Sequence, residues 1–116
     1  MKVLIGPRKT RIEIDGRDLW SLDYTLAQII APALKRFRKK PVGVPSSLCW
    51  DGEKEIPFAE ASKKWKALLD EMIFSFDCIA RDAVPCGPEG SKNAEVYDRV
   101  QRGLNLFAEW YMALWT

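Results

Sequence analysis

Histidine is absent from this chain of 116 residues, and its absence removes much of enzyme chemistry. Without an imidazole, the chain has no Ser-His-Asp triad, no histidine-ligated metal and no histidine pH switch. The sequence also lacks a P-loop, a G-x-G-x-x-G loop and a G-x-S-x-G motif. An enzyme made from it would depend on carboxylates, tyrosine and lysine alone. We therefore expect a protein that is not an enzyme and that carries neither a cofactor nor a metal ion.

Long apolar runs and a one-sided charge are also missing. No segment approaches the roughly 18 apolar residues of a membrane helix, and no secretory signal pattern opens the chain. The 18 Lys and Arg residues against 16 Asp and Glu residues give a net charge of +2. That balance does not match the basic stripe of duplex-binding proteins. We expect neither a membrane nor duplex nucleic acid as a partner.

Cysteine is scarce, with Cys49, Cys78 and Cys86 as the three examples. No two of them have C-x-x-C spacing, which disfavours zinc and thioredoxin-type sites. The odd number indicates plain thiols in a reducing, intracellular compartment.

Tryptophan is abundant by contrast, with five residues in a chain long enough for one domain over residues 1–116. Large aromatic side chains at this density indicate a well-filled core, an aromatic pocket or an interface. One tryptophan, Trp50, falls in a loop over residues 41–57 that is rich in proline, glycine and serine. It either packs back on the domain or contacts a partner.

A short β element is expected over residues 1–17. Lys2 to Ile5 is an apolar run, and Arg11 to Ile14 alternates polar and apolar residues. Residues 6–9 form the turn between them. An isolated hairpin is marginal in water, so this one must pack on something.

Three helices are expected, over residues 18–40, 58–80 and 93–114, from apolar residues at helical spacing. In the first, Pro32 predicts a kink or a break. Its predicted core stripe is Leu22, Leu26, Ile29, Ile30, Ala33 and Phe37. The fold class that follows is mainly α, a three-helix domain with a short N-terminal β-hairpin.

The second helix has apolar residues on two faces. Its main stripe is Trp65, Leu68, Leu69, Met72, Ile73, Phe76 and Ile79, and its second is Ala67, Phe74 and Cys78. A helix apolar on both faces is central or takes part in an interface, so we expect a homo-oligomer joined through the second stripe. In the third helix, Gly103 lies within the apolar stripe, which indicates close approach of another backbone or a ligand.

Seven residues are candidates for ligand binding. Asp23 borders the first helix stripe and either interacts with the helix dipole or anchors a ligand, and Tyr24 either packs or lines the same wall. Asp70 and Glu71 point about 100° apart on a helix, so they do not clasp one ion together. Each either pairs with a cation or contacts a ligand. The full candidate set is Trp20, Asp23, Tyr24, Asp70, Glu71, Arg99 and Arg102.

Residues 18–35, 65–76 and 99–115 resemble a family of small proteins encoded by tailed bacteriophages. The resemblance rests on the patterns W-S-x-D-x-T-L-A, L-D-E-M-I and G-L-x-L-F and covers roughly 40% of the chain. Tyr24 stands where members of the family carry histidine, and the 41–57 loop is shorter and less acidic than in many of them. The family has no assigned activity.

The resemblance implies a phage accessory protein in the cytoplasm of the infected host bacterium. By analogy with phage anti-defence factors, we expect it to sequester a nucleotide-derived immune signal in a pocket at a homo-oligomer interface, without catalysis. Trp20, Asp23 and Tyr24 would form one wall there, and the other four candidates would supply polar contacts. The alternative is a phage inhibitor that binds a host protein, or an interaction protein, with no small-molecule ligand. A third possibility is carboxylate- and metal-dependent nucleotide chemistry.

Overall fold

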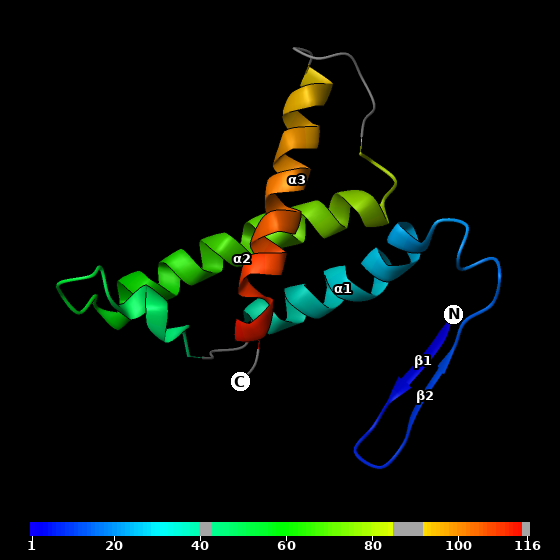
Figure 1. Ribbon diagram of the computed structural model, residues 1–116, viewed down its shortest axis with the longest axis horizontal. Coiled ribbons are helices and arrows are strands. Elements are labelled where there is room, and N and C mark those ends of the chain that lie inside the picture. Colours follow the sequence, from blue (N-terminus) through cyan, green and yellow to red (C-terminus); the bar gives the residue numbers. More distant parts are fainter. Residues whose placement is uncertain (40–42, 85–91, 115–116) are drawn as a thin grey trace.

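A computed structural model describes residues 1–39, 43–84 and 92–114. Its elements, in chain order, are β1 (Lys2–Ile5), β2 (Thr10–Glu13), α1 (Leu22–Lys39), the 3-10 helix η1 (Ser46–Cys49), α2 (Phe58–Ala80), α3 (Lys92–Trp110) and the 3-10 helix η2 (Tyr111–Ala113). β1 and β2 form an antiparallel hairpin. The structure therefore confirms a mainly α fold with three helices and a short N-terminal hairpin (Figure 1).

Helix α2 lies between the other two helices. Both α1 and α3 pack on it, whereas no Cα of α1 comes within 8 Å of a Cα of α3 in the described ranges. Figure 1 shows α1 running beside α2 and α3 crossing α2 steeply. The helices thus form a row with α2 in the middle rather than a closed bundle.

The core follows the predicted main stripe of α2. Trp65, Leu69, Met72 and Phe76 are buried, which confirms that prediction. Aromatic rings of α3 meet this stripe edge to face, with 5.7 Å between the ring centroids of Trp65 and Trp110. Such aromatic pairs contribute about 0.5–1.5 kcal/mol beyond the area that they bury.

Helix α1 packs through a different stripe from the one predicted. The buried residues are Ala27, Ala31 and Leu34, whereas Leu22, Leu26, Ile29 and Ala33 are exposed. Of the predicted stripe, only Ile30 and Phe37 pack against the core. Because Ala27 and Ala31 have small side chains, α1 can lie close to α2 on this side. With this side turned toward α2, Leu22, Leu26 and Ile29 face outward.

The predicted helix boundaries also need correction. Helix α1 begins at Leu22 rather than residue 18, and it continues through Pro32 without a break. Helix α3 ends at Trp110, and the chain tightens into η2 instead of remaining α-helical to residue 114. In the 41–57 loop, η1 is followed by a turn closed by a bridge between Trp50 and Glu55, which leaves Trp50 60% exposed.

Gly103 lies where α3 crosses α2. A Cβ atom at this position would overlap Ser75 Oγ and the backbone carbonyl oxygen of Glu71. The buried Ser75 hydroxyl donates a hydrogen bond of 2.7 Å to the backbone carbonyl of Val100 on α3. The close backbone approach expected for Gly103 is therefore the contact between two helices of the same chain.

We predict that Gly103→Ala lowers the free energy of unfolding by about 1–3 kcal/mol, because overpacking at the crossing outweighs the gain in helix propensity. Urea denaturation measures the change. Arg102→Ala is the matched control, one residue away on the exposed side of α3, and is expected to stay within about 0.5 kcal/mol of wild type. Equal stability of Gly103→Ala and wild type would contradict the close crossing.

Candidate functional site

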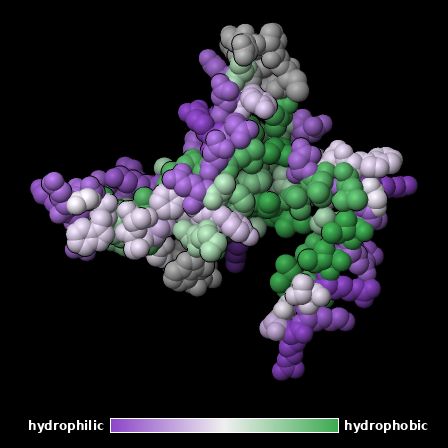
Figure 2. All heavy atoms as spheres, in the orientation of Figure 1, coloured by the Kyte–Doolittle hydropathy of each residue, from purple (hydrophilic) through white to green (hydrophobic). Residues whose placement is uncertain are grey.

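Exposed apolar side chains gather at the N-terminal end of the molecule. They come from the hairpin, the linker after it and α1, and Figure 2 shows apolar atoms over this region. We define the N-terminal face by these residues: Val3, Ile5, Ile12, Ile14, Leu19, Trp20, Leu22, Tyr24, Leu26 and Ile29. Monomeric soluble proteins rarely expose contiguous apolar patches larger than a few hundred Å², so this face is the candidate interaction surface.

The linker that carries Trp20 is held by polar contacts. Asp18 Oδ1 lies 2.8 Å from the N-terminal ammonium of Met1, and Asp18 Oδ2 accepts a hydrogen bond from the backbone N–H of Asp15. The hydrogen bond from the ammonium, followed by the one from Asp15, lowers the pKa of Asp18. Trp20 itself is 86% exposed, so within the chain it is not the wall of a pocket.

Asp23 and Tyr24 line a shallow depression at the start of α1. Its volume is about 380 Å³, and its other walls are Ser21 and, from the end of α2 and the segment after it, Ile79, Asp82 and Val84. Among the described residues that line it, two are carboxylates and none is a cation, so these residues do not attract phosphate. This depression joins only two of the seven predicted site residues.

Asp70 and Glu71 are both paired with arginines. Arg38 of α1 donates a hydrogen bond of 3.2 Å to Asp70, and Arg99 of α3 forms two hydrogen bonds of 3.1 Å to the two carboxylate oxygens of Glu71. The hydrogen bonding that Arg99 donates to Glu71 raises the pKa of Arg99. Of the two alternatives for Asp70 and Glu71, a cation partner or a ligand contact, the structure therefore shows the cation partner.

The predicted site residues consequently fall into separate places. Asp70 and Glu71 point to different helices, as their spacing predicted, and Arg102 is exposed on α3. Across residues 1–39, 43–84 and 92–114, no three potential ligands from His, Cys, Asp and Glu come together to hold a metal ion. Asp23, Asp70 and Glu71 therefore do not come together within the described ranges. Carboxylate- and metal-dependent chemistry would need these three side chains around one metal ion.

The second stripe of α2, expected at an oligomer interface, is partly used within the chain. The Arg99 guanidinium lies 3.7 Å from the ring centroid of Phe74, a cation–π contact. Cys78 is half-buried as a free thiol, and burial, followed by the charge of Asp77, raises its pKa. Ala67 alone of this stripe is exposed. Most of the exposed large apolar side chains of the described α-helices lie on α1, with Phe58 on α2 and Tyr97 on α3 as the others.

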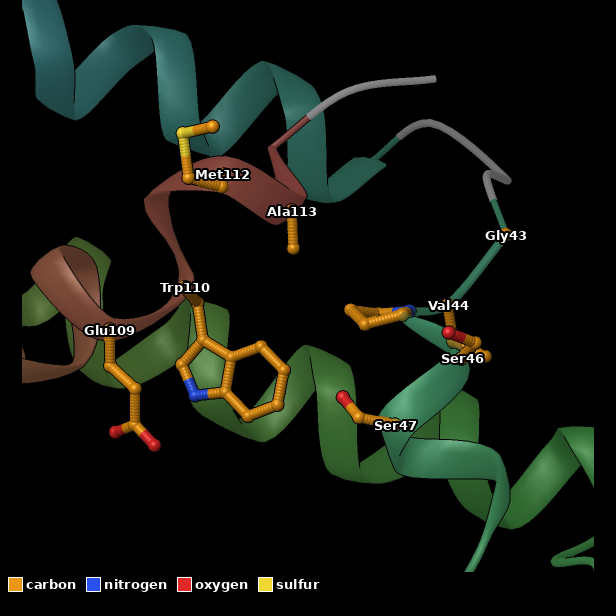
Figure 3. Close-up of a pocket in the computed structure, with 9 residues that line it drawn as sticks. Gly43, Val44, Ser46, Ser47, Glu109, Trp110, Met112 and Ala113 are labelled. Carbon is orange, nitrogen blue, oxygen red and sulfur yellow. The ribbon is translucent and has the colours of Figure 1, made fainter.

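A larger hollow opens at the other end of the molecule and was not predicted. Its volume is about 650 Å³, and Figure 3 shows Trp110 and Glu109 on one side and η1 residues Ser46 and Ser47 on the other. The sequence signals were the proline- and serine-rich loop and the position of Trp110 in the α3 stripe. Gly43 of its lining directly follows residues 40–42, and Ala113 lies two residues before 115, so this lining covers the described residues only.

No helix within the described ranges has the length and apolar character needed to cross a bilayer.

We predict a coupling energy of about 0.5–1 kcal/mol between Arg99 and Glu71, from a double-mutant cycle with Arg99→Ala and Glu71→Ala. The coupling should fall in 1 M salt because both side chains are partly exposed. A parallel cycle of Arg102→Ala with Glu71→Ala serves as the control and should give no coupling. Zero coupling between Arg99 and Glu71 would mean that both remain free for a ligand.

Comparison with known proteins identifies no relative. No family model matches the sequence, and neither a curated protein nor a solved structure matches it. The activity of the chain therefore has to be argued from its own surface, hollows and ion pairs.

Proposed function

We propose that this chain is a non-catalytic binding protein whose N-terminal face engages another protein. The observation that carries the proposal is the exposure of ten apolar side chains on that face, while four of the seven predicted polar and aromatic site residues are paired or isolated elsewhere. The resemblance to phage proteins supports an accessory role for this activity in the cytoplasm of an infected bacterium. This is the interaction-protein alternative of the sequence analysis.

Burial of this face would contribute substantial free energy. Apolar surface removed from water stabilises by about 25 cal/mol per Å². Trp20 is 86% exposed and projects from a linker held by the Asp18 contacts. Exposed tryptophans on a rigid support are typical anchor residues of protein interfaces. Trp20 is therefore the residue whose loss should weaken binding most.

Sequestration of a nucleotide-type signal at a homo-oligomer interface is the second candidate function. The depression beside Asp23 and Tyr24 favours it, because that volume falls within the range of ligand pockets and the depression adjoins the N-terminal face. A tyrosine ring could stack on a base, and a carboxylate could accept hydrogen bonds from ribose hydroxyls. The phosphates would need cations from a second copy, because neither Asp23 nor Asp82 attracts them.

We predict that a photoreactive p-benzoylphenylalanine in place of Trp20 crosslinks to protein in bacterial cells, and that the same residue in place of Met112 does not. The two positions are matched, since Trp20 is 86% and Met112 87% exposed, but Met112 lies on η2, outside the N-terminal face. Gel electrophoresis and mass spectrometry detect the products. Equal crosslinking at both positions, or none at either, would contradict the proposal.

A thermal-shift panel of cyclic dinucleotides, ADP-ribose isomers and plain nucleotides tests the second candidate. We expect shifts below about 1 °C at ligand concentrations of about a millimolar. A larger shift that Asp23→Ala or Tyr24→Ala abolishes would favour sequestration, provided that mass spectrometry recovers the ligand intact. Recovery of a cleaved ligand would instead favour an enzyme.

A further inference from the structure

The hairpin has one apolar side and one charged side. Val3 lies opposite Ile12 in the register. Because side chains alternate between the faces of a strand, Ile5 shares the side of Val3 and Ile12. The other side carries Lys2, Arg11 and Glu13, with Leu4 as its one apolar residue. Arg11 and Glu13 form an ion pair of 2.7 Å on that side. An antiparallel sheet with this pattern buries its apolar side on a core and leaves the charged side in water.

No described helix covers the apolar side of the hairpin. No Cα of β1 or β2 lies within 8 Å of a Cα of any helix in the described ranges, and Figure 1 shows the hairpin projecting away from the helices. Ile5 is 74% exposed and Ile12 52%. A two-stranded hairpin alone is marginal in water. This hairpin therefore needs a cover from outside its own helices.

Helix α1 presents a second uncovered apolar surface. Leu22, Leu26 and Ile29 follow one another at helical spacing on its outer side, and all three are exposed. The opposite side of α1 packs on α2 through Ala27 and Ala31. One chain thus carries an apolar side of the hairpin and an apolar side of α1, and both are exposed to solvent.

The exposed area and the dimensions of the molecule also favour an additional interface. Its solvent-accessible surface is 8868 Å², against about 6,500 Å² for a compact chain of this mass. Its radius of gyration is 16.8 Å, against about 13 Å for a compact domain of this length. The surplus area exceeds the roughly 800 Å² that each partner contributes to an interface of standard size.

We propose that a second copy of this chain covers the N-terminal face, in a two-fold symmetric dimer whose hairpins each pack on the N-terminal face of the other copy. This inference names the partner of the binding surface proposed above and rests on that proposal. A two-fold interface uses the same patch on both subunits. The N-terminal face suits it, because the projecting hairpin and the open face of α1 belong to one surface and can exchange between copies.

The charges around the face are partly self-complementary. Arg8 and Lys9 make the hairpin tip basic, whereas Asp15 in the linker and Asp23 in the first turn of α1 are carboxylates, and all four are exposed. Lys2 and Arg17 are also exposed near Asp15, so the charge at the open end of the hairpin is mixed. In a two-fold pair with antiparallel hairpins, the basic tip of each copy would meet Asp15 and Asp23 of the other.

Sedimentation velocity of the full chain over a concentration series tests the dimer. We expect a species of twice the 13.3 kDa chain mass, with a dissociation constant at or below about 10 µM, the weak end for an interface of standard size. Ile5→Glu should raise the dissociation constant about tenfold or more. Met112→Glu, an equally apolar and exposed position outside the face, should leave it unchanged.

A charge-reversal pair tests the antiparallel arrangement. Arg8→Glu with Lys9→Glu should weaken the dimer severalfold, and more at low than at high salt. Lys63→Glu with Lys64→Glu makes the same charge change on an exposed part of α2 and should have no effect. Circular dichroism confirms that each variant is folded, which is expected because the substituted side chains are exposed.

A monomeric wild type at 100 µM, or a dimer that Ile5→Glu leaves intact, would overturn the inference. A monomer that still crosslinks through position 20 to a different protein would refute the dimer and leave the proposed function standing. A dimer sensitive to Ile5→Glu whose position 20 crosslinks only to a second copy would confirm the dimer and count against a different protein as the partner of the N-terminal face.

Discussion

The contact on which the rest of this structure depends is the crossing of α2 and α3 at Gly103. Because this position has no side chain, the two backbones approach until the Ser75 hydroxyl of α2 reaches the Val100 carbonyl of α3. That approach brings the aromatic rings of α3 onto the buried stripe of α2, where Phe76 meets Phe107 with 4.8 Å between ring centroids. A larger residue in place of Gly103 would push α3 away from α2 at the crossing.

The crossing also determines what is left uncovered. Since α3 occupies one side of α2 and α1 another, the three helices lie in a row, and within the described ranges no helix packs on the far side of α1. Leu22, Leu26 and Ile29 remain open there for that reason. A closed bundle would have buried them. The apolar surface of the N-terminal end is thus a consequence of helix arrangement and not an accident of composition.

The sequence predicted the elements better than their contacts. The spacing of Trp65, Leu69 and Met72 identified the core of α2, because a central helix leaves a strong periodic pattern. It could not tell which of two apolar stripes of α1 faces that core. The answer depended on the small volume of Ala27 and Ala31, and periodicity weighs leucine above alanine. For the candidate site, spacing separated Asp70 from Glu71 correctly, but it could not show that residues distant in sequence, Arg38 and Arg99, would neutralise them.

The two candidate functions compete for the same charges. A nucleotide bound beside Asp23 needs cations from a second copy, and the nearest that the proposed dimer offers are Arg8 and Lys9 of the hairpin tip. In that dimer, however, the tip pairs with Asp15 and Asp23 of the other copy. Cations held by carboxylates have little attraction left for phosphate, since the pair is close to neutral. Dimerisation through the N-terminal face would therefore disfavour capture of an anionic signal beside Asp23.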